Sequence, residues 1–121
     1  MPFVVTQLRG EWKDGVVVLN GPVAVLRGRK ADTSDVMGCR IYHVWYAFEH
    51  VPCEGCPIDY PGHQDVKAEV LMGKEFFCRV PMEKKMGIHF FEVSLIGRKG
   101  ALGPLSNRIK LTINLQSKII N

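Results

Sequence analysis

Residues 87–113 read GIHFFEVSLIGRKGALGPLSNRIKLTI, and the fold follows from this stretch. Its first part places every second side chain on one side of the chain, namely His89, Phe91, Val93 and Leu95. The same period returns at Ile109, Leu111 and Ile113, after a break rich in glycine. A period of two is typical of a β-strand with one buried face. The stretch therefore predicts a β-hairpin.

Four earlier segments carry strand signals: residues 2–9, 16–19, 39–48 and 75–80. Asp14-Gly15 is typical of a tight turn and predicts that the first two strands pair as a hairpin. Asn20-Gly21-Pro22 favours a turn, so we expect the second strand to stop there. No amphipathic helix of useful length is present. Short strands separated by turn signals predict an all-β fold, one antiparallel β-sandwich of about seven strands over residues 1–121.

Length and composition limit the class of protein. A chain of 121 residues has the size of one ordinary domain, and 46% hydrophobic with 23% charged residues is typical of a globular fold. No run of about 18 apolar residues is present, so we expect no membrane span. The net charge of +4 is a mild excess. The densest basic stretch, Arg27 to Lys30, has no interleaved aromatic residue, so we expect no nucleic-acid partner.

Residues 39–48 carry the strongest strand signal in the middle of the chain, and both faces of this strand are largely apolar. Such a strand is either covered on both sides or shows one face to a partner. Tyr42, Tyr46 and Phe48 are therefore candidates for a partner-binding surface. The alternative is that the following connection folds back over them.

That connection, residues 49–73, is long for a compact domain, and connections of this length are usually functional or cross-linked. We expect a loop that contains the Cys-x-x-Cys motif of Cys53 and Cys56. Residues 65–72 within it fit either one helical turn or a short strand. The loop is the most distinctive part of the chain.

Three stretches together resemble a fibronectin type III module: residues 14–22, 38–42 and 89–113. They resemble, in turn, the second strand with its preceding turn, the third strand, and the closing pair of strands of that family. Gly21 stands where the family has its core tryptophan, and His89 where it has its corner tyrosine. An immunoglobulin-like variant of the sandwich is the alternative. If His89 replaces the tyrosine, its ring should hydrogen-bond the backbone of the preceding connection.

The segment Pro52-Cys53-Glu54-Gly55-Cys56-Pro57 also resembles a feature of predicted bacterial envelope lipoproteins that carry such a domain. The resemblance implies a spacer or protein-binding module of the periplasm or cell envelope, with a protein partner and no catalytic residues. It also implies a lipidated cysteine upstream of Met1, which would tether the chain to a membrane. Residues 1–8 are too short to be a secretory signal themselves.

The four cysteines allow three disulfide pairings. Cys53 and Cys56 are close enough for a local bond that would staple the long loop. Cys39 and Cys78 fall on apolar faces of two predicted strands, where they can meet across the core. Both bonds require an oxidising compartment. The alternative for Cys39 and Cys78 is a pair of buried thiols that pack as small hydrophobic side chains.

A second hypothesis for the loop is a structural zinc site in a cytoplasmic binding protein. Its candidate ligands are His50, Cys53, Cys56 and His63. No nucleophile, base and orienting group occur at a recognisable spacing, so we expect no enzymatic activity. His43 and His89 fall on inward-facing positions, which favours core histidines over general bases.

Overall fold

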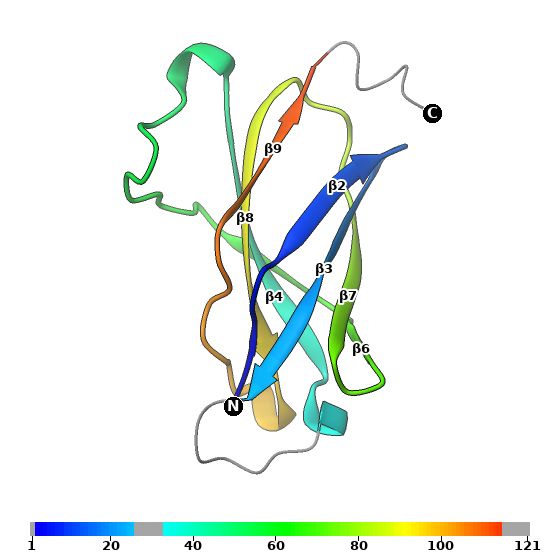
Figure 1. The fold of residues 1–121 in the computed structure, drawn as a ribbon. Coiled ribbons are helices and arrows are strands. Elements are labelled where there is room, and N and C mark those ends of the chain that lie inside the picture. Colours follow the sequence, from blue (N-terminus) through cyan, green and yellow to red (C-terminus); the bar gives the residue numbers. More distant parts are fainter. Residues whose placement is uncertain (1, 26–32, 115–121) are drawn as a thin grey trace.

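The computed structural model describes residues 2–25 and 33–114, which form two antiparallel β-sheets packed as a sandwich (Figure 1). The first sheet contains β1 (Phe3–Val5), β2 (Arg9–Lys13), β3 (Val16–Val25), β6 (Glu69–Leu71) and β7 (Glu75–Pro81). The second sheet contains β4 (Gly38–Tyr46), β5 (His63–Val66), β8 (Gly87–Ile96) and β9 (Ile109–Ile113). The short 3-10 helices are η1 (Thr33–Asp35), η2 (Phe48–His50) and η3 (Arg98–Gly100). No helix in this part of the chain is long and apolar enough to cross a membrane.

The strands follow the order β1-β3-β7-β6 in the first sheet, with β2 also beside β3, and β5-β4-β8-β9 in the second. This is the strand order of an immunoglobulin-like sandwich. The prediction of an all-β antiparallel sandwich is confirmed. The described residues hold nine strands rather than about seven, because the first expected strand is divided and two short strands lie in the expected loop.

The closing hairpin, β8 and β9, buries the predicted face. His89 lies opposite Leu111 and Phe91 opposite Ile109 in the strand register. The inward side chains of β8 are all buried, namely His89, Phe91, Val93 and Leu95. The last three pack against core residues of the first sheet, including Phe3, Leu19 and Phe76. Full burial of a large apolar side chain contributes roughly 1.5 to 3 kcal/mol, so this layer holds the two sheets together.

The first expected strand, residues 2–9, is interrupted between β1 and β2, where Gln7 has a φ of 49°. The predicted hairpin forms between β2 and β3. Asp14 and Gly15 join these strands with φ angles of 50° and 83°, as a tight turn with two positive φ angles requires. β1 pairs instead with the second half of β3.

The expected stop at Asn20-Gly21-Pro22 is wrong, because β3 continues to Val25. Pro22 fits within the strand because its backbone faces the end of β1, where the ladder between β1 and β3 stops, and not β7. Its carbonyl oxygen accepts a hydrogen bond from Thr6 N at 2.9 Å. A glycine is needed beside it, since a β-carbon on Gly21 would lie 3.0 Å from Thr6 O.

The connection at residues 49–73 is not a plain loop, because it contains β5 and β6. The segment 65–72 is extended: it completes β5 in the second sheet and then forms β6 in the first. The chain crosses between the sheets at residues 67–68. Arg40 holds β5 beside β4 through two bonds to the Asp65 carboxylate, at 2.9 and 3.1 Å. This ion pair lowers the pKa of Asp65.

The first half of the connection folds over the outer face of the second sheet. The ring of Tyr60 lies 5.7 Å from that of Tyr42, and its hydroxyl donates to Glu92 Oε2 at 2.6 Å. Arg108 Nη1 donates to Cys56 O at 3.0 Å. The alternative of a loop that folds back is therefore what the structure shows at Tyr42.

The three candidates for a partner surface differ in exposure. Tyr42 is partly buried beneath the loop, and Tyr46 packs edge-on against Phe90 with ring centroids 5.9 Å apart. Phe48, in η2, is 48% exposed. These residues therefore do not form one open aromatic face, and a partner role for Phe48 stays a prediction.

Candidate functional site

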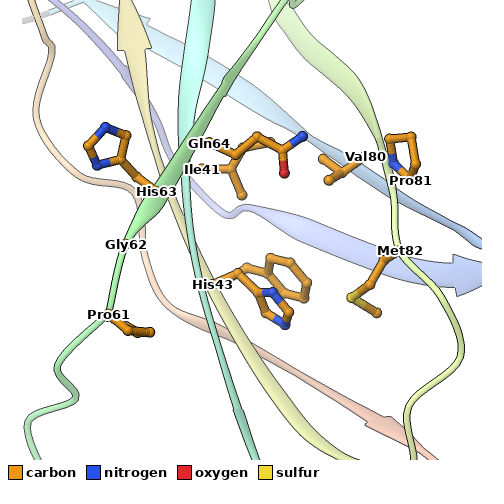
Figure 2. A pocket seen from close by; sticks show the side chains of 10 residues that line it. Ile41, His43, Pro61, Gly62, His63, Gln64, Val80, Pro81 and Met82 are labelled. Atoms are coloured by element: carbon orange, nitrogen blue, oxygen red, sulfur yellow. The ribbon is translucent and has the colours of Figure 1, made fainter.

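A pocket of about 390 Å³ opens on the side of the sandwich between β5 and β7 (Figure 2). We name it the lateral pocket. Its lining includes Ile41 and His43 from β4 and Gln64 from β5, with Pro61 just before that strand. Val80 from β7 and Met82 just after it complete the set named here. Side chains from both sheets and from the connection before β5 therefore meet in one place.

The lateral pocket exists because β6 is short. β6 pairs only with residues 75–77, so no described strand lies beside the second half of β7 on the side away from β3. On the opposite wall, β5 is the edge strand of the second sheet. The space between the sheets is thus left open here, and the core residues Ile41 and Phe91 line it.

His43 lines the pocket with its ring stacked on Phe91, at a centroid distance of 4.5 Å. Its Nε2 lies 2.8 Å from His89 Nδ1, and His89 Nε2 lies 2.8 Å from Lys85 O. A carbonyl oxygen only accepts, so His89 Nε2 carries the proton and its Nδ1 accepts in the neutral ring. His43 Nε2 therefore donates to His89. The Nδ1 of neutral His43 keeps its lone pair.

The hydrogen bond from His89 to Lys85 confirms the prediction made for this position. Lys85 lies in the connection between β7 and β8, and His89 follows near the start of β8. The imidazole therefore bonds the preceding backbone, as a corner tyrosine hydroxyl does in immunoglobulin-like folds. The expected inward orientation of both histidines is confirmed as well, with His89 only 1% exposed and His43 half-buried.

Both histidines are neutral at pH 7. Burial, with the neighbouring His89 and the charge of Lys85, lowers the pKa of His43 to about 4. Burial likewise lowers the pKa of His89. Among the described residues, no fully buried side-chain nitrogen or oxygen lacks a partner. No bond from a described residue to His43 Nδ1 is present, so this atom is not fully enclosed, and the ring that carries it lines the pocket.

The remaining walls are mostly apolar. Figure 2 shows the Met82 side chain facing the His43 ring, the Gln64 amide extended toward β7, and Pro61 and Pro81 on opposite walls. His63 points to the other side of β5, where its ring centroid lies 5.9 Å from that of Tyr42. The lateral pocket therefore combines an apolar lining with one well-defined hydrogen-bond acceptor.

The structure places Cys53 and Cys56 as a disulfide, with their Cα atoms 5.3 Å apart, as expected for a stapled loop. The alternative zinc set, His50, Cys53, Cys56 and His63, is not assembled. Its two cysteines bond to each other, and His63 packs on Tyr42. Within residues 2–25 and 33–114, no group of three or more His, Cys, Asp or Glu side chains is arranged to hold a metal ion.

Cys39 and Cys78 meet across the core, from β4 in one sheet and β7 in the other. Both are buried free thiols, with their Sγ atoms 3.8 Å apart. The alternative of two packed thiols is therefore what the structure contains. The hydrogen bond with Cys78, together with burial, strongly raises the pKa of Cys39.

Comparison with protein families, curated proteins and solved structures finds no match for this chain. Sequence reasoning did not find the lateral pocket. The usable signal was a pair of inward-facing histidines on strands that turn out to be neighbours, with His43 opposite Phe91 and His89 opposite Trp45.

We expect the domain to lose stability as the pH falls from about 6.5 to about 4. The pKa of His43 falls from 6.5 to about 4 on folding, so the unfolded chain binds more protons in this window. The free energy of unfolding is therefore highest above pH 6.5, and it decreases as the pH falls towards the pKa of His43 in the folded protein. With allowance for partial exposure, the loss is roughly 1 to 3 kcal/mol. Urea unfolding followed by tryptophan fluorescence at several pH values measures it.

The matched variants are His43→Phe, which keeps a ring on Phe91, and His50→Phe at an exposed position. We expect the first to flatten the pH dependence and the second to leave it unchanged. Equal slopes for the wild type and His43→Phe would contradict the assignment of this titration to His43.

Proposed function

We propose that this domain is a non-enzymatic binding module that takes an extended segment of a partner protein along β7, with one side chain in the lateral pocket. The observation that carries the proposal is the uncovered second half of β7, residues 78–81, which lies directly beside this pocket. An exposed strand edge recognises a partner through its main chain, and adjacent pockets select the side chains.

The backbone of Arg79 supports this reading, because its N–H and C=O groups point away from β3. Val23 N donates to Lys74 O, so the odd-numbered residues of β3 face β7. The register pairs those residues with even-numbered positions of β7, such as Leu19 with Cys78. Backbone direction alternates along a strand, so Arg79 faces the open side.

A second pocket of about 460 Å³ lies further along the same edge. It is lined by Lys67, Glu69, Phe77, Cys78 and Arg79. Lys67, Glu69, Phe77 and Arg79 alternate with core residues, so this pocket lies on the outer face of the edge and the lateral pocket on the inner face. Successive side chains of an extended segment point to opposite faces, so neighbouring residues of one segment can reach both pockets. Two pockets along one open edge therefore suit an extended peptide better than a single compact ligand.

The edge also has features that limit unselective pairing. Pro81 lacks an N–H group, and Arg79 places a charge on the strand, as natural sheet edges do to prevent aggregation. The main-chain contribution is therefore restricted to a few hydrogen bonds. A partner must supply matching side chains for the pockets, which makes recognition specific.

The disulfide of Cys53 and Cys56 supports placing this function in an oxidising compartment, the periplasm or cell envelope. In that setting the sandwich serves as a spacer or adaptor, in keeping with the resemblance to fibronectin type III modules. A lipidated segment upstream would tether it to a membrane. Thiol titration of protein purified from its native source, with and without reductant, tests the compartment.

The variant Arg79→Pro tests the proposed pairing. Linear peptides are selected from a random displayed library on the wild type, and their affinities are then measured for each variant. We expect Arg79→Pro to weaken binding about tenfold, because it removes the one outward N–H group of this edge. The matched variant Arg79→Ala, which keeps the N–H group, should bind within about threefold of the wild type.

Hydrogen exchange supplies an independent readout, since the Arg79 amide should become protected when a peptide binds. The proposal fails if the library gives no peptide that competes at this edge. It also fails if Arg79→Pro binds the selected peptides as tightly as the wild type.

A further inference from the structure

We infer that the group held in the lateral pocket is an aromatic ring with one N–H or O–H donor, the side chain of a tryptophan or tyrosine in the partner segment. The inference rests on the proposed function for the source of the ring. The choice of ring depends on three features of the pocket itself: its hydrogen-bond acceptor, the charge beside it and its walls.

The acceptor is His43 Nδ1. The chain of hydrogen bonds through His89 to Lys85 O fixes the proton of His43 on Nε2. Nδ1 is left as an acceptor for which no described residue supplies a donor, and it is not fully enclosed, on a ring that lines the pocket. A ligand buried against it must donate a hydrogen bond, because an unmet acceptor in an apolar site is costly.

The positive charge of Lys85 limits the kind of hydrogen-bond donor that a ligand can bring to His43. Lys85 lies close enough to act on His43, and its ammonium group sits 3.7 Å from the centroid of the Trp45 ring. A lysine or arginine from the partner would be repelled by this charge and would lose its own hydration. A carboxylate has no proton to donate to His43. A neutral donor fits this environment.

The walls and the size of the pocket select a ring. The lining is largely apolar, and the Met82 thioether and the rings of Pro61 and Pro81 offer surfaces on which an aromatic face packs well. A cavity of about 150 Å³ already accepts benzene. The 390 Å³ of the lateral pocket therefore admits an indole or a phenol with its polar tip directed at His43. Only tryptophan and tyrosine combine a large apolar body with one neutral donor.

The test compares indole with indene, which has the same shape but no N–H group. Binding to the full chain is followed by NMR, through the Met82 methyl and the His43 ring resonances. We expect indole to shift both sets and to bind about tenfold more tightly than indene. A second pair, 4-methylphenol against toluene, should give the same ratio. Equal binding within each pair overturns the inference, as does the absence of shifts in these resonances near the solubility limit.

Two variants test whether indole binds in the lateral pocket beside His43. In His43→Phe the acceptor is lost, so the indole-to-indene ratio should fall to about one. Gly62→Trp fills the pocket from a position where a β-carbon would meet no atom within 4 Å, so the fold should tolerate it. Indole binding should then disappear while the unfolding midpoint stays unchanged. Indole binding to Gly62→Trp at the wild-type affinity also overturns the inference.

The indole test of the ring and the peptide test of the partner segment can fail independently of each other. If library peptides bind at β7 but indole shows no preference over indene, the ring assignment is wrong and the proposed function stands. If indole binds as expected but no peptide pairs with Arg79, the pocket chemistry stands and the partner is not an extended segment.

Discussion

Replacing Gly87 with alanine is expected to destabilise the domain by roughly 3 to 5 kcal/mol, combining backbone strain with overpacking. Gly87 has a φ of 143°, in the region that favours glycine. A β-carbon there would overlap Trp45 Nε1 and lie 2.5 Å from Tyr46 O. Neither group can move aside without cost. Trp45 Nε1 donates to Met86 O at 3.0 Å, and Tyr46 is held in the ladder opposite Ile88.

Gly62→Ala is the matched control for this prediction. The β-carbon at Gly62 would have no atom within 4 Å, so this change should alter the free energy of unfolding by less than about 0.5 kcal/mol. Urea unfolding of both variants, followed by tryptophan fluorescence, gives the comparison. A loss of less than about 1 kcal/mol for Gly87→Ala would show that the tight approach of β8 to β4 is not required.

The parts of the fold that could be predicted are those coded by local alternation. In β8 every second residue from His89 to Leu95 faces inward, so the pattern itself gives both the strand and its buried face. The hydrogen bond of His89 was also predictable. A residue at this corner of the sandwich lies beside the preceding connection, and the His89 ring bonds Lys85 O there.

The parts that could not be predicted depend on partners distant in the sequence. The outward residues of β5 are polar and exposed, and this segment becomes a strand because it pairs with residues 39–42 of β4. Likewise, Asn20-Gly21-Pro22 is a turn signal in isolation. It is extended here because Gly21 and Pro22 pair with residues 75–76 of β7, and Pro22 O accepts a bond from Thr6 N on the other side.

The lateral pocket is another feature that could not be predicted from the sequence. It arises from where β6 ends and where the chain crosses between sheets, and neither property has a local signature. The four candidate zinc ligands are not brought together for a related reason. The spacing from His50 to His63 gave suitable ligands, but spacing does not encode that β5 turns His63 onto Tyr42.

Oxidising Cys39 and Cys78 to a disulfide is expected to raise the free energy of unfolding by about 4 kcal/mol. The bond would close a loop over a sequence separation of 39, and the loss of unfolded-chain entropy for a loop of this length gives about that value. The Sγ atoms are already 3.8 Å apart, so closure requires only a small movement of two side chains. With oxidised glutathione as the oxidant, two protein thiols become one disulfide and two molecules of reduced glutathione are released.

The native protein should oxidise slowly. Disulfide exchange requires a thiolate, and the hydrogen bond to Cys78 and burial both raise the pKa of Cys39. Denaturant removes both effects, so oxidation during refolding should be much faster than oxidation of the folded domain. Thiol titration over time, in native buffer and in urea, measures this difference.

The double variant Cys53→Ser, Cys56→Ser isolates the buried pair, because Cys39 and Cys78 are then the only cysteines in the chain. Its oxidised and reduced forms should differ by the full 4 kcal/mol or so in urea unfolding. Adding Cys78→Ala should abolish that difference and leave one titratable thiol. If the double variant loses both thiols on oxidation without gaining stability, strain from joining β4 to β7 offsets the entropy gain. The two sheets would then be packed at a separation that suits thiols and not a bond.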